Sequence, residues 1–406
     1  MTHPIIIIGS GLAGWTTVRE FRKLDTTTPV MLITADNGDF YAKPSLSNAF
    51  AQKRGPAQLV TTAAASMAKT LGITLLPRTQ VTALDTAARI VSTSVGDYAY
   101  SQLVLATGAN AIRVPVAGNA ADQLQSVNSL NDFTEFHDRL HPASAPESAR
   151  RRHVLIMGAG LIGCEFANDL AAAGYQVSVA DPASGPIAAL LPAAASTQLR
   201  DALAALGVIW HFGTRVVSVN RDPETATDSG QAPLRVELEN GHIAFVDTVL
   251  SAIGLRANTT LAQAAGVICE RGVLVDERLQ TSAPGVYALG DGAQYAQGWW
   301  GDAADITLRG GRTLPFVMPI MSAARALAAT LAGKPTPVVF PLMPVAIKTP
   351  ALPIVVAAPA PGAPGQWRMV EPGIWHFEDV AGQQLGFVLT GQQTSRRAEQ
   401  TKATAA

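Results

Sequence analysis

Several features that mark particular classes of protein are scarce in this 406-residue chain. It has only two cysteines, Cys164 and Cys269, too few for the disulfide framework of a small secreted domain. Its 30 lysine and arginine residues are matched by 31 acidic ones, so it lacks the basic excess of a general nucleic-acid binder. Charged residues make up 15% of the chain and apolar residues 48%. Such a chain can bury sizeable cores, and its length favours two or three domains.

Long uninterrupted apolar runs are also missing. The most apolar late stretch, Val338–Pro364, contains Lys348 and several prolines, which exclude a membrane-spanning helix. Residues Met1–Ile5 show no basic segment of the kind that opens a signal peptide. These absences favour the cytoplasm.

What the chain does contain is a glycine-rich turn directly after its first apolar run. We expect a strand over Pro4–Ile8 and a helix over Trp15–Leu24. The turn between them consists of Gly9, Ser10, Gly11, Leu12, Ala13 and Gly14. In a dinucleotide-binding turn the first glycine permits the sharp bend, the second lets the backbone approach a pyrophosphate, and the third lets helix and strand pack closely. The amides at the start of the helix then face the phosphates, so the pattern predicts a dinucleotide site.

The next strand, expected over Val30–Thr34, does not end in the acidic residue that usually holds the adenosine ribose. Ala35 occupies that place and Asp36 follows it. Three alternatives stay open. Asp36 reaches the ribose, or Thr34 and backbone groups bind it, or Asp36 is an ordinary solvated turn residue.

A second turn of the same kind follows a connecting segment, His141–Arg152, that is rich in Pro, Ala, Ser and Arg. A strand is expected over Val154–Met157 and a helix over Cys164–Ala173. The turn between them consists of Gly158, Ala159, Gly160, Leu161, Ile162 and Gly163. The next strand, Gln176–Ala180, is closed by Asp181. An acid there binds two ribose hydroxyls, whereas a 2′-phosphate would require an arginine, so the turn favours NADH over NADPH. Alternatively, Asp181 only forms an Asp-Pro turn.

Two such turns predict two dinucleotides, either a bound flavin and a diffusible nicotinamide or the ligands of two fused but unrelated domains. Three further segments favour the first alternative. Leu103–Ala109 is a strand that ends in a turn at Gly108, Val249–Arg256 repeats that pattern, and Gly285–Asp291 ends in Gly-Asp. This order resembles the two-dinucleotide flavoprotein reductases of the glutathione-reductase-like superfamily. The resemblance implies that FAD and NADH are the cofactors and that Asp291 contacts the ribityl chain of the flavin.

The same resemblance implies the fold and its domains. We expect an α/β fold with two Rossmann-like dinucleotide-binding domains and a small α+β C-terminal domain. The FAD-binding domain is expected over residues 1–117 and 248–333, because the NADH-binding domain, residues 118–247, is inserted into it. The C-terminal domain is expected over residues 334–406.

The cysteines limit the kind of reductase. A disulfide reductase requires two sulfurs within reach of each other beside the flavin. The early segment expected to contact the flavin, Phe40–Ser47, contains no thiol, and packing is the expected role of both Cys164 and Cys269. We therefore expect the electrons to leave for an external acceptor, without a metal in the site.

Two segments indicate the branch of the superfamily. Lys43, directly before a proline, resembles the basic residue of the ferredoxin and rubredoxin reductases. Pro344–Pro350, which contains Lys348, is similar to the bacterial rubredoxin reductases and lacks the tryptophan usual in ferredoxin reductases. Further similarity lies in Arg113–Val116, Gly163–Leu170 and Val317–Pro319. A helix expected over Ile320–Leu331 would direct its positive end toward the flavin.

Carried over residue by residue, the resemblance implies a set of flavin contacts. They are Ser10 to Ala13, Thr34, Ala35, Lys43, Val81, Glu165, Asp291, Val317 and Lys348. Lys43 would tune the electronics of the flavin, and Glu165 would face the place where nicotinamide meets flavin, with Lys43 as a candidate partner. Alternatively, Lys43 is a solvated loop lysine, and Glu165 only complements the dipole of its helix.

The implied reaction is hydride transfer from NADH to FAD, followed by two single-electron transfers to rubredoxin, which would serve an alkane hydroxylase or an oxygen-reducing system. Arg309, Arg312 and Lys348 are candidates for a basic surface that binds an acidic rubredoxin. Tyr295–Leu314 is longer than the corresponding segment of the family. The sequence does not determine the oligomeric state, and a monomer is a plausible expectation.

Three alternatives remain. A ferredoxin reductase of a monooxygenase system would differ only in its partner, and the segment around Lys348 counts against it. A redox-sensing protein would bind FAD and NADH to change an assembly and would turn over slowly with every acceptor. An NADH oxidase is disfavoured because the thiol that it usually employs is missing.

Overall fold

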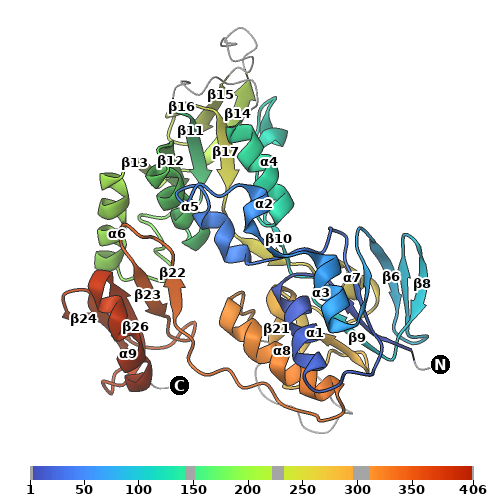
Figure 1. The fold of residues 1–406 in the computed structure, drawn as a ribbon. Coiled ribbons are helices and arrows are strands. Elements are labelled where there is room, and N and C mark those ends of the chain that lie inside the picture. The colour runs from blue at the N-terminus through green and yellow to red at the C-terminus, as the bar shows by residue number, and fades with distance from the viewer. Residues whose placement is uncertain (1–2, 142–150, 222–232, 296–310, 405–406) are drawn as a thin grey trace. The chain divides into compact units, whose positions relative to one another are not determined.

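The computed structural model describes residues 3–141, 151–221, 233–295 and 311–404 (Figure 1). The chain forms two compact units. Unit 1 consists of Met1–Ala42, Val60–Asn110 and Leu255–Phe340. Unit 2 consists of Lys43–Leu59, Ala111–Gly254 and Pro341–Ala406.

Unit 1 is built on a five-stranded parallel sheet with the strand order β20-β9-β1-β2-β5. Its strands are β1 (Ile5–Ile8), β2 (Val30–Ile33), β5 (Thr74–Leu76), β9 (Gln102–Leu105) and β20 (Val286–Ala288). Every residue of β1 is buried, and its unbroken isoleucine run is typical of a parallel strand that is covered on both faces.

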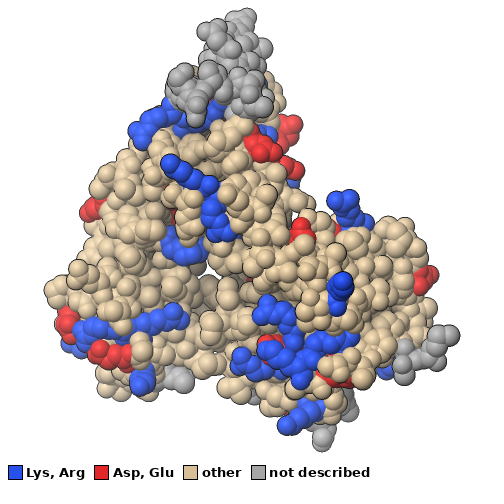
Figure 2. Space-filling view, in the orientation of Figure 1, with Lys and Arg blue, Asp and Glu red and all other residues tan. Residues whose placement is uncertain are grey.

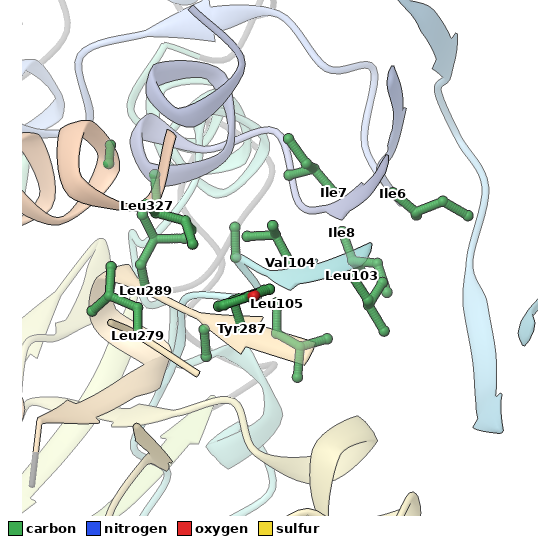
Figure 3. Close-up of a cluster of buried hydrophobic side chains, with 14 of the residues drawn as sticks. Ile6, Ile7, Ile8, Leu103, Val104, Leu105, Leu279, Tyr287, Leu289 and Leu327 are labelled. Carbon is green, nitrogen blue, oxygen red and sulfur yellow. The ribbon is translucent and has the colours of Figure 1, made fainter. Parts of the chain in front are cut away.

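Two helices in contact with each other cover part of this sheet: α1 (Leu12–Arg22) and α8 (Val317–Leu331). Figure 3 shows side chains of β1, β9 and β20 gathered with Leu327 of α8 in one buried cluster. The remaining elements are β3 (Phe40–Tyr41), β4 (Val60–Thr62), α3 (Ala64–Leu71), β6 (Val81–Asp85), β7 (Ile90–Thr93), β8 (Gly96–Ala99), β10 (Ala109–Ala111), β18 (Leu255–Ala257), α7 (Thr260–Ala264), β19 (Val273–Val275), η4 (Gly290–Gly292) and β21 (Ala293–Tyr295).

Unit 2 contains a four-stranded parallel sheet with the order β13-β12-β11-β17. Its strands are β11 (His153–Met157), β12 (Gln176–Asp181), β13 (Val208–Phe212) and β17 (Thr248–Ser251). The other elements of this part are η1 (Lys43–Asn48), α2 (Pro56–Leu59), η2 (Ala121–Gln123), α4 (Leu130–Leu140), α5 (Leu161–Ala172), α6 (Ala193–Ala205), β14 (Val216–Arg221), β15 (Leu234–Leu238) and β16 (Ile243–Val246).

The C-terminal part of unit 2 is a five-stranded antiparallel sheet with the order β22-β23-β26-β25-β24. Its elements are β22 (Val345–Ile347), β23 (Ile354–Ala357), β24 (Gln366–Glu371), β25 (Ile374–Glu378), β26 (Gln384–Thr390), η5 (Gly391–Arg396) and α9 (Arg397–Ala403). The Thr390 hydroxyl donates to Gln198 of α6 at 2.9 Å, so this sheet contacts the helical layer of unit 2.

The predicted α/β class is confirmed. Three helices differ from their predicted bounds at their first residues. The helices expected from Trp15, Cys164 and Ile320 each begin three residues earlier, at Leu12, Leu161 and Val317. Pro319 therefore lies in the first turn of α8, where its missing N–H would have no partner inside the helix.

The compact units also differ from the predicted domains. Strand β17 begins at Thr248, where the return to the first domain was expected, but it pairs with β11 as part of the unit 2 sheet. The segment Lys43–Leu59 was expected in the first domain and belongs to unit 2. The assignment of cofactors to domains stays a prediction. Among the described residues, none of the helices combines the length and the apolar character that crossing a bilayer requires.

Candidate functional site

The first glycine turn, in unit 1, has a backbone conformation and close contacts that leave no room for a side chain at its first and third glycines. Gly9 has a φ of +110°, and a Cβ atom there would lie 2.3 Å from the carbonyl oxygen of Ala106. A Cβ on Gly14 would lie 1.9 Å from the carbonyl oxygen of Gly9. A Cβ on Gly11 would meet no atom within 4 Å, so the space in front of the second glycine is open. This is the arrangement expected where a pyrophosphate approaches the backbone.

The second turn, in unit 2, repeats this geometry. Gly158 has a φ of +101°, and a Cβ there would lie 2.8 Å from the carbonyl oxygen of Ala252. A Cβ on Gly163 would lie 1.9 Å from the carbonyl oxygen of Gly158, while Gly160 faces open space. Within the described residues, no side chain caps α1 or α5 and no acid lies in their first turns. Both helix starts therefore offer free backbone amides to an anion.

Strand register shows which residue of unit 1 corresponds to Asp181. Ile8 pairs with Ile33 in unit 1, and Met157 pairs with Ala180 in unit 2. Each glycine turn begins one residue further on, so the place of Asp181 is taken by Thr34 and not by Ala35.

The Asp181 carboxylate is held against its own glycine turn. It accepts hydrogen bonds from the backbone N–H of Ala159 at 2.6 Å and from that of Ala183 at 2.7 Å. It therefore lies beside the second residue of the turn, as an acid that binds a ribose must.

Asp36 has a comparable place in unit 1, although it is two residues further along the chain than Thr34. It accepts hydrogen bonds from the hydroxyls of Ser10 at 2.9 Å and Thr34 at 2.6 Å, and from the backbone N–H of Gly38 at 2.9 Å. The carboxylate is thus tied to the first glycine turn through two hydroxyls, which is not the environment of an ordinary solvated turn residue.

The Gly-Asp turn of η4 lies against the first glycine turn. A Cβ on Gly290, whose φ is +80°, would lie 2.9 Å from the Cβ of Ala13, and a Cβ on Gly292 would lie 3.0 Å from the carbonyl oxygen of Gly108. Unit 1 therefore brings three of the predicted flavin-binding segments together, including Asp291.

Two further predicted contacts lie in unit 1. The backbone N–H of Thr79 donates to the Thr34 carbonyl at 2.8 Å, and β6 begins with Val81 two residues later. Val317 is the first residue of α8 and is 40% exposed.

In unit 2, the structure brings together Glu165, Lys348 and a residue that the sequence had not indicated, Ser47. The Lys348 ammonium forms an ion pair with Glu165 and donates to the Ser47 hydroxyl at 2.8 Å. Ser47 in turn donates to Glu165 at 2.7 Å, and the backbone N–H of Lys348 donates to the other carboxylate oxygen at 3.0 Å.

The charges and hydrogen bonds of this cluster compensate one another, as the burial of its side chains requires. The side chain of Glu165 is 7% exposed and that of Lys348 31%. A buried carboxylate is tolerated when a cation and hydrogen-bond donors compensate it, as they do here. Lys43 begins η1, the short helix that also contains Ser47. The presence of Ser47 in the same predicted flavin segment as Lys43 was its only signal in the sequence.

The cysteines have no features of redox-active thiols. Cys164 is fully buried in α5, donates to the Ala159 carbonyl at 3.3 Å, and has its pKa raised by burial. Burial raises the pKa of Cys269 to about 11. A reactive cysteine requires the opposite shift, toward the thiolate. Within the described part of the chain, no three His, Cys, Asp or Glu side chains meet in a way that could hold a metal ion.

These features define a class of protein: two open glycine turns, each at the uncapped start of a helix, fit two dinucleotides. Comparison with known families is more specific. The chain belongs to the pyridine nucleotide-disulphide oxidoreductase family, which it matches over residues 3–316. Residues 337–404 match the rubredoxin binding C-terminal domain family.

Curated relatives cover almost the whole chain. It is 40% identical over 403 residues to a rubredoxin-NAD(+) reductase of Alcanivorax borkumensis, with 98% of each chain covered. It is 39% identical over 402 residues to a nitric oxide reductase FlRd-NAD(+) reductase of Aeromonas salmonicida, with 97% of this chain and 95% of the relative covered. The predicted resemblance is therefore confirmed.

Solved structures confirm the fold. The putidaredoxin reductase in its covalent complex with putidaredoxin superposes with a TM-score of 0.83 at 22% identity, covering 99% of this chain and 93% of that one. The ferredoxin reductase of the CYP199A2 system from Rhodopseudomonas palustris gives the same TM-score.

The predicted basic docking surface stays a prediction. Arg309 lies outside the described residues, Arg312 is exposed in unit 1, and Lys348 is paired with Glu165 in unit 2. Over the C-terminal sheet, basic side chains are interleaved with acidic ones (Figure 2). Arg368 pairs there with Glu378.

Proposed function

We propose that this chain is an FAD-dependent NADH:rubredoxin oxidoreductase. The observation that carries the proposal is the combination, in one chain, of two dinucleotide-binding turns with a C-terminal segment, residues 337–404, that matches the rubredoxin binding family. The relative that is 40% identical over 98% of the chain is named for that reaction. A reductase for a ferredoxin would share the two turns but not that C-terminal match.

Unit 1 is proposed to hold FAD. The open space at Gly11 and the free amides of α1 would bind the pyrophosphate, and Thr34 with the nearby Asp36 would bind the adenosine ribose. The full set of proposed contacts in this unit is Gly9, Ser10, Gly11, Leu12, Ala13, Gly14, Thr34, Ala35, Val81, Gly108, Asp291 and Val317. Bound FAD would supply the chemistry that no side chain here offers, acceptance of a hydride and release of single electrons.

Unit 2 is proposed to hold NADH. Gly158, Gly160 and Gly163 would admit its pyrophosphate, and Asp181 would bind two hydroxyls of the adenosine ribose. A 2′-phosphate would place negative charge against the Asp181 carboxylate, so NADPH is expected to bind more weakly than NADH.

Lys43, Glu165 and Lys348 are proposed to contact the flavin ring system. Lys348 presents a fixed positive charge because Glu165 and Ser47 hold its ammonium group in place. Because Glu165 neutralises much of this charge, Lys348 would act on the ring mainly as an oriented N–H donor, which still favours the reduced flavin. Glu165 cannot leave this network without exposing an uncompensated charge, so its proposed role is to orient Lys348.

The proposed domains are residues 1–117 and 248–333 for FAD, residues 118–247 for NADH and residues 334–406 for rubredoxin. Lys43–Leu59 and β17 are exceptions, because both belong to unit 2. One NADH would then reduce two rubredoxins, and the proposed location of the enzyme is the cytoplasm. The proposed downstream users of the electrons are an alkane hydroxylase or an oxygen-reducing system.

The names of two relatives favour a second acceptor. Relatives from Aeromonas salmonicida and Aeromonas hydrophila, 39% and 38% identical, are named FlRd-NAD(+) reductases of a nitric oxide reductase. An FlRd protein is therefore the second candidate acceptor.

The test mixes purified, FAD-loaded protein with NADH and follows three acceptors by visible absorbance: rubredoxin, an FlRd protein and a two-iron ferredoxin. Rapid bleaching of rubredoxin with slow reduction of ferredoxin is expected. Rapid reduction of ferredoxin alone would overturn the proposal and favour a monooxygenase reductase. Slow turnover with all three would favour a redox sensor.

A further inference from the structure

Helix α5 buries the polar residues Glu165, Asn168 and Asp169, whereas its other buried residues are apolar or glycine. Taken as whole residues, Glu165 is 6% exposed, and Asn168 and Asp169 are 3% exposed each. Burying such groups costs free energy unless hydrogen bonds compensate it. Glu165 is explained by the proposed flavin site, but Asn168 and Asp169 are not part of that site.

Asp169 binds the chain just after the segment that contains Lys43 and Ser47. Its two carboxylate oxygens accept hydrogen bonds from the backbone N–H groups of Phe50 at 2.9 Å and Ala51 at 2.8 Å. Burial raises the pKa of Asp169, and these amide donors act against that rise. Both oxygens are acceptors, which is the hydrogen-bonding pattern of an ionised carboxylate.

Asn168 binds the other lysine-containing segment. Its side-chain carbonyl accepts a hydrogen bond from the backbone N–H of Ala351 at 3.0 Å, three residues after Lys348. Glu165 holds the same segment through the backbone N–H of Lys348 at 3.0 Å. Successive buried residues of α5 thus hold two segments that are about 300 residues apart in the chain, as the 301-residue separation of Ser47 and Lys348 shows.

We propose that Asn168 and Asp169 are positioning residues for the proposed reaction. Asp169 fixes the segment with Lys43 and Ser47, and Asn168 fixes the segment with Lys348. Both segments are held on the helix that begins at the proposed NADH turn. The inference rests on the proposed function. Its physical basis is that a displacement of about 1 Å at a reacting centre can reduce a rate about 100-fold.

The first experiment measures backbone amide exchange in full-length, FAD-loaded protein. Asp169→Asn retains the shape of the side chain but directs an amide N–H at one of two N–H donors. We expect faster exchange at Phe50 and Ala51 and through residues 43–51, with unchanged exchange at Ala351. Asn168→Ala is the matched control and is expected to show the reverse pattern. Equal changes at both segments in both variants, or no change in either, would overturn the proposal.

The second experiment follows flavin reduction by NADH in a stopped-flow instrument, without rubredoxin. Each variant is expected to lower the limiting rate between about 10-fold and 100-fold. The NADH concentration at half-limiting rate should stay within about twofold, because Asp181 and the glycine turn are unchanged. A visible shift in the flavin absorbance band should accompany the slower rate. A changed NADH affinity with an unchanged limiting rate would contradict a positioning role.

A third variant keeps the inference testable if the Asp169 variant does not fold. Ser47→Ala leaves both buried anchors in place and removes only the hydroxyl that joins the first segment to Glu165 and Lys348. It should lower the limiting rate in the same direction, and an unchanged rate would count against the proposal. Because these readouts need no rubredoxin, they stay informative if rubredoxin is not the acceptor.

Discussion

The two glycine turns can be compared position by position. Gly9 and Gly158 have φ angles of +110° and +101°, and the third glycine of each turn leaves the same 1.9 Å between a would-be Cβ and a carbonyl oxygen. The second glycines, Gly11 and Gly160, have φ and ψ angles that agree within about 10° and both face open space. One short pattern therefore produces one backbone in two separate units.

The helices that leave these turns differ in what they bury. In α1, Trp15 and Thr16 are fully buried, and the Thr16 hydroxyl points to the sulfur of Met321 in α8. The residue of α5 that corresponds to Thr16 is Glu165, which holds Lys348. The glycines therefore determine the backbone to which we propose that a phosphate binds, whereas the residues that follow determine which distant segments the helix contacts.

The largest effect is expected from alanine at the third glycine of either turn. Gly14→Ala and Gly163→Ala each place a methyl group 1.9 Å from a backbone oxygen that no rotamer change can move. Each should lower the free energy of unfolding by about 3 kcal/mol. FAD should be lost from the first variant and retained by the second, which should instead fail to be reduced by NADH. Urea unfolding and flavin absorbance measure both effects.

The matched controls are the second glycines. Gly11→Ala and Gly160→Ala meet no atom within 4 Å, so their stability should change by less than about 1 kcal/mol. Their cofactor binding should still weaken, because a methyl group occupies the space proposed for the pyrophosphate. A stability loss equal to that of the third-glycine variants would refute the steric explanation.

The next effect concerns the polar cluster that α5 has and α1 lacks. Lys348→Met leaves the Glu165 carboxylate, 7% exposed, without its cation. The free energy of unfolding should fall by about 2 kcal/mol, less than for a fully buried pair because Lys348 is 31% exposed. Adding Glu165→Gln should recover most of the lost free energy of unfolding, because the buried charge is removed. Chemical denaturation of the two variants and the wild type gives the answer, and a double variant less stable than Lys348→Met alone would contradict it.

A smaller effect on cofactor binding should distinguish Asp181 from Asp36. Asp181→Asn should weaken NADH binding about tenfold, because a charge-assisted hydrogen bond to the ribose is lost. It should leave FAD in place. Asp36→Asn should instead weaken FAD retention, through the hydroxyls of Ser10 and Thr34, without changing NADH affinity. Titration with NADH and the flavin content after dialysis distinguish the two, and an effect of Asp36→Asn on NADH alone would reverse the proposed assignment.

The smallest effect is a pH dependence that arises from a histidine of unit 2. The ring of His137 lies 4.3 Å from that of His141 and 6.0 Å from that of Phe50. Burial lowers the pKa of His137, the charge of His141 lowers it further, and Asp138 acts in the opposite direction. The folded state therefore binds fewer protons than the unfolded state, so stability should fall as the pH drops below the ordinary value of 6.5.

His137→Gln removes that titrating group. Urea midpoints measured between pH 8 and pH 5 should fall less steeply for this variant than for the wild type. The ring of His137 lies against Phe50, whose backbone N–H donates to Asp169. The rate of flavin reduction by NADH should therefore also fall as the pH drops. Equal slopes for variant and wild type would exclude His137 as the source of acid sensitivity.

Much of the local structure could be predicted because it depends on neighbouring residues. The strands β1 and β11 and both glycine turns were expected within one residue of their observed bounds. The helix starts were expected too late because Gly14 and Gly163 were assigned to the turns, whereas they lie in the first helical turns. Pairing of strands, not spacing along the chain, identifies Thr34 as the residue that corresponds to Asp181.

By itself, the sequence determined the two dinucleotide turns, the α/β class and the family, because a glycine's φ and a strand's burial leave signals within a few residues. Only the tertiary structure decided that Ser47 and Lys348 meet at Glu165, and that Asn168 and Asp169 hold the segments on which they lie. Ser47 is 118 residues from Glu165, and Lys348 is 183 residues from it. No local pattern encodes such a meeting, because it depends on which surface of α5 is buried and on which distant backbone amides reach that surface.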